Sequence, residues 1–140
     1  MSEPRDRVVY VAYADGASRG NPGPSAIGVV IFDAAGREVH RESRRTGHGT
    51  NNEAEYRAAI AALEAALGLG ASHLELRMDS ELVVRQLTGR YRVRNPRLAP
   101  LYGRLLDLRS RFQSVTFRNV PRGSNRLADV LANQALDRSP

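Results

Sequence analysis

The fold of this chain is constrained most by residues 13–24, a stretch that begins Tyr-Ala-Asp-Gly and ends Asn-Pro-Gly-Pro. Residues 8–13 are rich in β-branched and aromatic side chains, a composition typical of a strand buried on both faces. The glycines and prolines that follow predict that the strand ends and the chain turns. Asp15 is therefore expected at a strand end, next to glycine amides that can approach a ligand closely. Taken alone, the stretch fits a metal-binding turn and an ordinary hairpin loop equally well.

Periodicity along the rest of the chain predicts further strands and helices. Apolar runs and two-residue alternation predict strands at residues 8–14, 26–32, 37–43, 73–78 and 114–120. Helices are expected after capping residues at Thr50, Ser80 and 124–125, and another at about residues 97–112. The first three strands read as an antiparallel meander, and the later units alternate. The order β-β-β-α-β-α-α-β-α therefore predicts an α/β (α+β) fold with helices flanking a mixed sheet.

Composition bounds the class of protein. With 140 residues, 41% of them hydrophobic, the chain is expected to form one domain over residues 8–137. The absence of cysteine excludes disulfides, zinc–thiolate sites and thiol nucleophiles. Residues 1–7 are polar, lack a signal-peptide apolar region, and are expected to form a flexible arm. No apolar run is long enough to span a bilayer, so a cytoplasmic protein is expected.

The charge balance favours a nucleic-acid partner. The formal net charge is +6, and all 21 basic residues are arginines, whose planar guanidinium can bind two phosphate oxygens at once. Many soluble proteins are basic, so this signal is weak alone. Four arginines surround Tyr91 in residues 90–97, which fit either a solvated loop or a phosphate-gripping loop containing Arg92 and Arg94. A phosphate-gripping loop would make binding weaken as salt rises.

Four carboxylates lie where strand or helix ends could direct them to one place. Asp15 and Asp79 each follow a predicted strand. Glu55 is expected in the first turn of the first helix, and Asp129 near the start of the last. Each has an ordinary structural explanation as a turn, helix-entry, dipole-compensating or solvated residue. If all four converge, their mutual repulsion requires cations, and oxygen ligands favour Mg²⁺ or Mn²⁺, used in pairs for phosphodiester chemistry.

Four motifs in chain order resemble the type 1 ribonuclease H (ribonuclease HI) family. They are Asp15-Gly16 with the loop 20–24, residues 50–55 (Thr-Asn-Asn-Glu-Ala-Glu), residues 78–80 (Met-Asp-Ser) and residues 125–129 (Asn-Arg-Leu-Ala-Asp). Each is moderately specific, but all four in order, within a resemblance that covers about residues 8–136, are a strong signal. The resemblance implies a five-stranded mixed sheet of strand order 3-2-1-4-5 with flanking helices.

The resemblance also implies an activity and its residues. The family hydrolyses the RNA strand of RNA–DNA hybrids as an endonuclease, independently of sequence, with two divalent metal ions and 5′-phosphate products. By motif, the catalytic residues and metal ligands are Asp15, Glu55, Asp79 and Asp129. The resemblance implies substrate contacts at Gly16, Asn21, Asn51 and Asn52. Arg92, Arg94, Arg122 and Asn125 are further candidate substrate contacts. Contacts to 2′-hydroxyls would distinguish RNA from DNA.

Two departures from the common bacterial pattern resemble the archaeal-like branch of the family. Many members carry a histidine in the loop before the last helix, but residues 120–125 have none and offer Arg122, which cannot act as a base. His40, His48 and His73 are expected to be structural or solvated. Residues 90–97 are also too short for the basic protrusion with which many members grip the hybrid.

Three functions are therefore weighed. The first is a monomeric endoribonuclease acting on RNA–DNA hybrids, with no membrane partner. The second is a nuclease or strand-transfer domain of the wider superfamily with DNA as substrate, which the loop 20–24 and the Asn51-Asn52 pair disfavour. The third is a non-catalytic hybrid-binding module, which would be expected to lack one or more of the four carboxylates.

Overall fold

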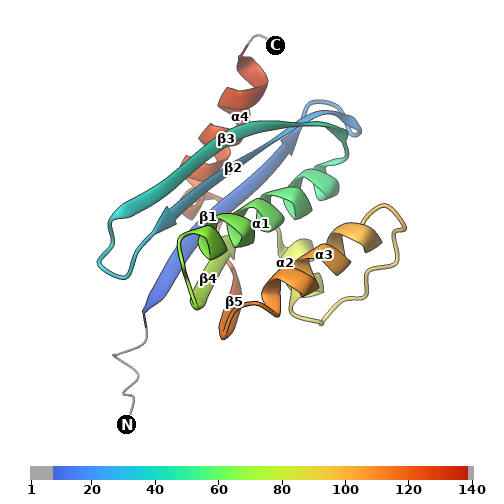
Figure 1. Cartoon of the computed structure of the whole chain (residues 1–140). Coiled ribbons are helices and arrows are strands. Elements are labelled where there is room, and N and C mark those ends of the chain that lie inside the picture. The colour runs from blue at the N-terminus through green and yellow to red at the C-terminus, as the bar shows by residue number, and fades with distance from the viewer. Residues whose placement is uncertain (1–7, 139–140) are drawn as a thin grey trace.

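A five-stranded mixed sheet forms the centre of the computed structural model, which describes residues 8–138 (Figure 1). Its strands are β1 (Val9–Ser18), β2 (Gly23–Phe32), β3 (Glu38–Gly49), β4 (His73–Met78) and β5 (Ser114–Asn119). Their order is β3-β2-β1-β4-β5, with antiparallel pairing among β1, β2 and β3 and parallel pairing of β4 with β1 and β5. This confirms the predicted class and strand order. The expected arm, residues 1–7, lies outside the described residues.

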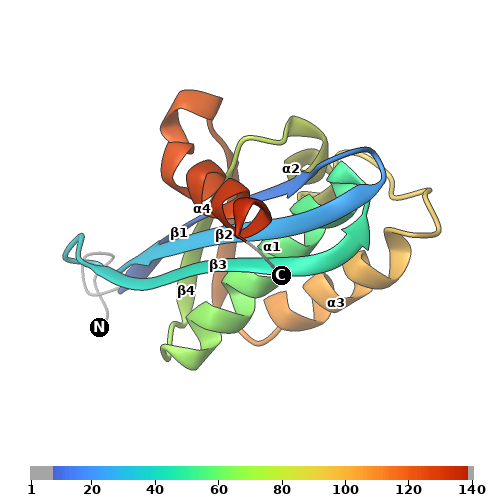
Figure 2. The same cartoon turned by 90° about the horizontal axis from the view of Figure 1, so that it is seen from above.

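Helices cover both faces of this sheet. They are α1 (Asn51–Gly68), α2 (Glu81–Leu87), α3 (Ala99–Arg109), the 3-10 turn η2 (Arg122–Ser124) and α4 (Arg126–Asp137). Figure 2 shows α4 on one face, and α1 with α3 on the other. The main core lies between α1 and the sheet. The many alanines of α1 let the helix approach the strands closely. Within residues 8–138, no helix combines the length and apolar character needed to cross a membrane.

Strand β1 is longer than the sequence predicts. Residues 15–18 pair with residues 25–28 of β2, so the strand does not end at Asp15, and that prediction is wrong. The parallel pairing of β1 with β4 ends earlier, at Tyr13. Asp15 therefore lies inside β1, where β2 still borders the strand on one side and β4 has separated from it on the other. This separation opens space beside the Asp15 carboxylate.

Two glycines let helices touch the sheet at backbone distance. A Cβ atom on Gly16 would lie 2.2 Å from the carbonyl carbon of Ala54 in α1. A Cβ atom on Gly28, which pairs with Asp15, would lie 2.1 Å from the carbonyl oxygen of Ala128 in α4. Real Cβ atoms do not approach this closely. Since Ala54 and Ala128 each precede one of the predicted acidic ligands, these two contacts set how near those ligands come to β1.

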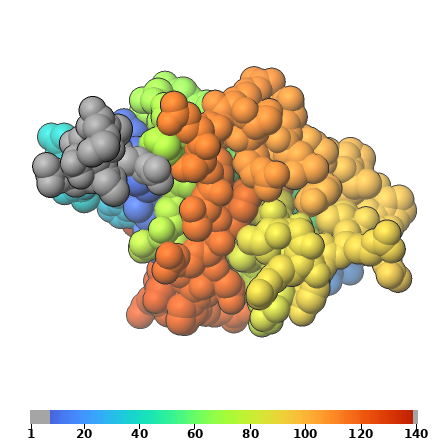
Figure 3. Space-filling model, turned by 90° about the horizontal axis from the view of Figure 1, so that it is seen from below, coloured from blue at the N-terminus to red at the C-terminus, as the bar shows by residue number. Residues whose placement is uncertain are grey.

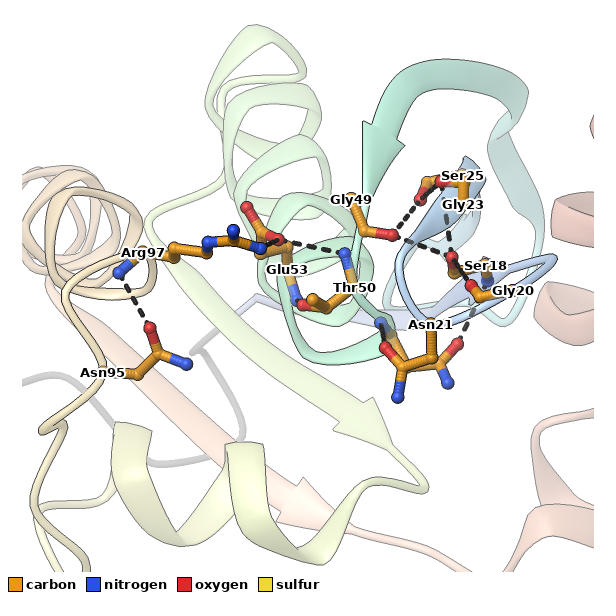
Figure 4. A network of polar contacts seen from close by, with 11 residues as sticks. Ser18, Gly20, Asn21, Gly23, Ser25, Gly49, Thr50, Glu53, Asn95 and Arg97 are labelled. Carbon is orange, nitrogen blue, oxygen red and sulfur yellow. Dashed lines mark hydrogen bonds and ion pairs between the residues drawn. The ribbon is translucent and has the colours of Figure 1, made fainter.

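The start of α1 is fixed by the predicted capping box. The Thr50 side chain accepts from the Glu53 backbone N–H at 3.1 Å, and the Glu53 carboxylate accepts from the Thr50 N–H at 2.9 Å. The carboxamide of Asn21 accepts from the Asn51 N–H at 3.1 Å, so the β1–β2 loop is held against α1 (Figure 4). In the same network Arg97 lies 4.0 Å from Glu53.

The segment between α2 and α3 contains no helix, in agreement with the expected lack of a basic protrusion. Residues 88–98 run as a loop, and α3 is two residues shorter at its start than predicted and ends at Arg109. Figure 3 shows α2 beside β5 on the surface, with this loop extending to the edge of the molecule. Arg92 and Arg94 are exposed on it.

Candidate active site

Three of the four predicted carboxylates meet in one place. Asp15 of β1, Glu55 of α1 and Asp79, just after β4, each offer an oxygen within 4.8 Å of the others. Asp15 and Glu55 are only 6% and 8% exposed, and Asp79 is partly buried. Glu55 is the fifth residue of α1, so it lies in the second turn and not in the first as predicted. The convergence expected from the sequence is therefore present for this acidic triad of Asp15, Glu55 and Asp79.

The triad lies in a cleft with a volume of about 360 Å³. The cleft is lined by Asp15, Gly16, Ala17, Ser18, Asn51, Asn52, Glu55, Asp79, Ser80, Arg122 and Asp129. Asp129 thus belongs to the same cleft, although its carboxylate is not part of the closest group. Ser18 and Ser80 were not predicted to line the site, although Ser80 was predicted to cap α2, a role that it also has.

Most of the carboxylates are held by a specific donor. The backbone N–H of Gly16 donates to Oε1 of Glu55 at 2.6 Å. Asn125 Nδ2 donates to Asp79 Oδ2 at 3.3 Å, and Asn133 Nδ2 donates to Asp129 Oδ1 at 3.2 Å. Asn133 was also missed, although its spacing of four residues from Asp129 on a helix could have indicated it.

Burial and like charge disfavour ionisation of the triad. Burial, followed by the charges of Glu55 and Asp79, raises the pKa of the Asp15 carboxyl far above its usual range. Burial also raises the pKa of the Glu55 carboxyl, although the Gly16 N–H opposes this. At neutral pH the triad therefore resists carrying all of its negative charge without a compensating cation.

The donor set fits a hard divalent cation. The triad and Asp129 offer carboxylate oxygens, without a sulfur or imidazole ligand among the residues lining the cleft. Mg²⁺ and Mn²⁺ prefer such oxygens and are bound by one to a few carboxylates together with water. The mutual repulsion within the triad would be relieved by such an ion.

The acidic triad predicts an unusual pH dependence of stability in EDTA. Because the pKa of Asp15 is raised in the folded protein, the folded protein retains a proton that the unfolded chain has lost above about pH 4, so stability should fall as pH rises. We expect the free energy of unfolding to fall more for wild type than for Asp15→Asn between pH 5 and 8. The extra loss is about 1.4 kcal/mol for each pH unit over which only the folded protein keeps this proton. Urea unfolding of both proteins in EDTA measures this. Parallel curves for the two would contradict it.

The other predicted contact residues divide into four groups. Gly16, Asn51, Asn52 and Arg122 line the cleft. Asn21 instead holds the Asn51 backbone, and Arg92 and Arg94 are exposed on the loop 88–98 and do not line the cleft. Asn125 is 1% exposed and does not line the cleft. Its predicted role as a side-chain cap of α4 is wrong, because its Oδ1 accepts no hydrogen bond from the first turn of the helix.

Comparison with known proteins points to one family. A family model described as reverse transcriptase-like matches residues 13–135. Ribonuclease HI of Halobacterium salinarum is 48% identical over 126 residues, which are 90% of this chain and 63% of that protein. The bifunctional protein Rv2228c of Mycobacterium tuberculosis is 47% identical over 128 residues, 91% of this chain and 35% of that protein. The chain thus spans about a third of the mycobacterial relative.

Solved structures agree in fold and in sequence. The crystal structure of RNase H1 from Halobacterium salinarum has a TM-score of 0.91 at 46% identity, covering 94% of this chain and 99% of that one. The structure of LC11-RNase H1, isolated from compost, in complex with an RNA/DNA hybrid has a TM-score of 0.87 at 41% identity, covering 91% and 96%. Since its fold and sequence are shared with these proteins over nearly its whole length, the chain belongs to the type 1 ribonuclease H family.

Proposed function

We propose that this protein is a metal-dependent endoribonuclease that hydrolyses the RNA strand of RNA–DNA hybrids without regard to sequence. The observation that carries the proposal is the buried acidic triad at the base of an open, polar cleft. The family membership and the hybrid bound to LC11-RNase H1 support the choice of substrate.

The proposed metal ligands are Asp15, Glu55, Asp79 and Asp129. Bound in a pair, Mg²⁺ or Mn²⁺ would lower the pKa of an attacking water and stabilise the leaving oxygen. The protein's part is to hold the carboxylates at fixed positions: Glu55 by the Gly16 N–H and Asp129 by the Asn133 amide. Because Asp15 and Glu55 are shielded from bulk water, their charge acts strongly on whatever the triad binds.

Recognition of RNA is assigned to the polar rim of the cleft. Gly16, Asn51 and Asn52 line the cleft and can bond to 2′-hydroxyls and sugar oxygens, while Asn21 keeps the Asn51 backbone in place. Such contacts read the shape and hydroxyls of the hybrid and not its bases, which would make cleavage independent of sequence.

The arginines are assigned to phosphates. Arg122 lines the cleft, and its charge helps to lower the pKa of Glu55 against the effect of burial. Its permanent positive charge is assigned to the scissile phosphate. It takes no part in proton transfer, since guanidinium does not deprotonate. Arg92 and Arg94 are assigned to phosphates farther along the hybrid, so binding should weaken as salt rises. The cytoplasmic location and monomeric state stay predictions.

A cleavage panel tests the proposal. End-labelled RNA–DNA hybrid, duplex RNA and duplex DNA are each incubated with Mg²⁺, Mn²⁺ or excess EDTA. We expect cleavage of the RNA strand of the hybrid at many positions with metal, and none in EDTA. Preferred cleavage of duplex DNA would favour the DNA nuclease alternative. Tight hybrid binding without cleavage in either metal would favour the non-catalytic module.

A further inference from the structure

Asn125 lies behind the acidic triad, between η2 and α4. Its Nδ2 group donates to the backbone oxygen of Ala14 at 3.0 Å and to Asp79 Oδ2 at 3.3 Å. A backbone carbonyl and a carboxylate both accept hydrogen bonds, so the carboxamide is oriented with its NH₂ group toward them. Ala14 directly precedes Asp15. One side chain therefore joins the segment that carries Asp15 to the Asp79 carboxylate.

The backbone of Asn125 reaches two further parts of the cleft. Its carbonyl oxygen accepts from the Asp129 N–H at 3.1 Å, which places the first turn of α4. Its own N–H donates to the Arg122 carbonyl at 3.0 Å and closes η2. Three acidic residues and the cleft arginine are thus positioned with reference to this residue, which is 1% exposed and has no direct access to a substrate.

The remaining polar atom of Asn125 argues against a merely space-filling role. Oδ1 is buried without a hydrogen-bond partner among the described residues. Leaving a buried acceptor unpaired costs about 1–3 kcal/mol. An apolar side chain would avoid that cost, so the asparagine is explained by what its NH₂ group does for Ala14 and Asp79.

We propose that Asn125 is a positioning residue for metal binding, and this rests on the proposed function. Its amide orients the Asp79 carboxylate and fixes its distance from Asp15, so the triad is arranged before an ion arrives. Residues that orient metal ligands in this way typically contribute about 10–100-fold to metal affinity. The ligand whose affinity depends on Asn125 is a divalent cation. Binding of the hybrid does not require Asn125.

Two substitutions separate this role from a substrate contact. Asn125→Ala removes the donor, and Asn125→Asp keeps the size but places an oxygen against Asp79 and Ala14. Asn119→Ala is the matched control, because Asn119 Nδ2 donates at 3.1 Å to the backbone oxygen of Met78, next to Asp79, and not to a carboxylate. Titration calorimetry of each protein with MgCl₂ and MnCl₂ measures metal affinity without catalysis. Hybrid affinity is measured in EDTA, and cleavage as a function of Mg²⁺ concentration.

We expect Asn125→Ala to weaken metal binding by about 10–100-fold and to raise the Mg²⁺ needed for half-maximal cleavage equally. Its hybrid affinity in EDTA should stay within about twofold of wild type, because a residue that acts through the metal ligands does not touch the substrate. Asn125→Asp should be more impaired, and Asn119→Ala should match wild type. If Asn125→Ala does not fold, Asn125→Asp and Asn125→Ser carry the test.

The outcomes distinguish this inference from the proposed function. If wild type cleaves hybrid and folded Asn125 variants bind Mg²⁺ normally, the positioning role is overturned and the function stands. Lower hybrid affinity with unchanged metal binding would make Asn125 a substrate contact and also overturn it. If wild type binds Mg²⁺ and loses that binding in Asn125→Ala but cleaves no hybrid, the function fails and the positioning role holds.

Discussion

Replacing Asp79 by asparagine is expected to reduce hybrid cleavage by at least about 1,000-fold, or about 4 kcal/mol of transition-state stabilisation. In the proposed mechanism, the amide cannot replace the carboxylate charge that would hold a divalent ion beside Asp15 and Glu55. The fold should stay intact, and in EDTA the variant should be as stable as wild type or more so. Both effects have one cause, because the charge proposed to bind the ion also repels its buried neighbours when no ion is bound.

Glu81→Gln is the matched control for this prediction. Glu81 is two residues away in the first turn of α2, does not line the cleft, and pairs with Arg85 at 2.8 Å on the surface. It should leave cleavage within about twofold, because an exposed ion pair contributes little. Cleavage rates under single-turnover conditions and urea unfolding in EDTA supply the two measurements. Near wild-type cleavage by Asp79→Asn would sink the site assignment.

Replacing Gly16 by alanine is expected to destabilise the protein by about 3 kcal/mol or more and to remove activity in what remains folded. The new methyl group would lie 2.2–2.4 Å from three backbone atoms of Ala54 and Glu55. Backbone atoms cannot rotate away as a flexible side chain can, so α1 would have to move off β1. The Gly16 N–H bond to Glu55 and the position of Glu55 in the triad would be lost together.

Gly103→Ala shows what the same change does where space is free. Gly103 lies inside α3, and a Cβ atom there meets nothing within 4 Å. Alanine should be neutral or stabilise the helix by up to about 1 kcal/mol. Urea unfolding compares the two variants directly. Equal stability of Gly16→Ala and Gly103→Ala would mean that α1 does not touch β1 as described.

Much of the fold could be predicted because its signals are local. Each signal extends over only a few residues, as in the capping box of Thr50 and Glu53, the Ser80 cap and the two-residue alternation of residues 73–78. Such signals depend on nearest neighbours and survive any tertiary arrangement. The order of elements, together with the family motifs, was then sufficient to predict the sheet order correctly.

The errors fall where pairing partners override local preference. Residues 15–18 contain Gly16 and polar side chains of low strand propensity, yet they extend β1 because β2 supplies a ladder of hydrogen bonds. Asparagine before a helix is typical of an N-cap, but the Asn125 amide instead donates to Ala14 in β1 and to Asp79 after β4. Both acceptors lie in segments remote in sequence. Local propensity carries no information about either partner.

The amino-acid sequence was enough to predict which helices and strands form and which acidic side chains are the candidate ligands, since helix and strand periodicity extend over only a few positions. The three-dimensional packing was needed to bring oxygens of Asp15, Glu55 and Asp79 within 4.8 Å, with Asp129 slightly apart. That closeness depends on α1 touching Gly16 and on Asn125 bridging β1 to Asp79. These contacts join residues that are far apart in sequence: Ala54 is 38 positions from Gly16, and Asn125 is 111 positions from Ala14. At such separations, the packing of whole helices and strands sets the distances.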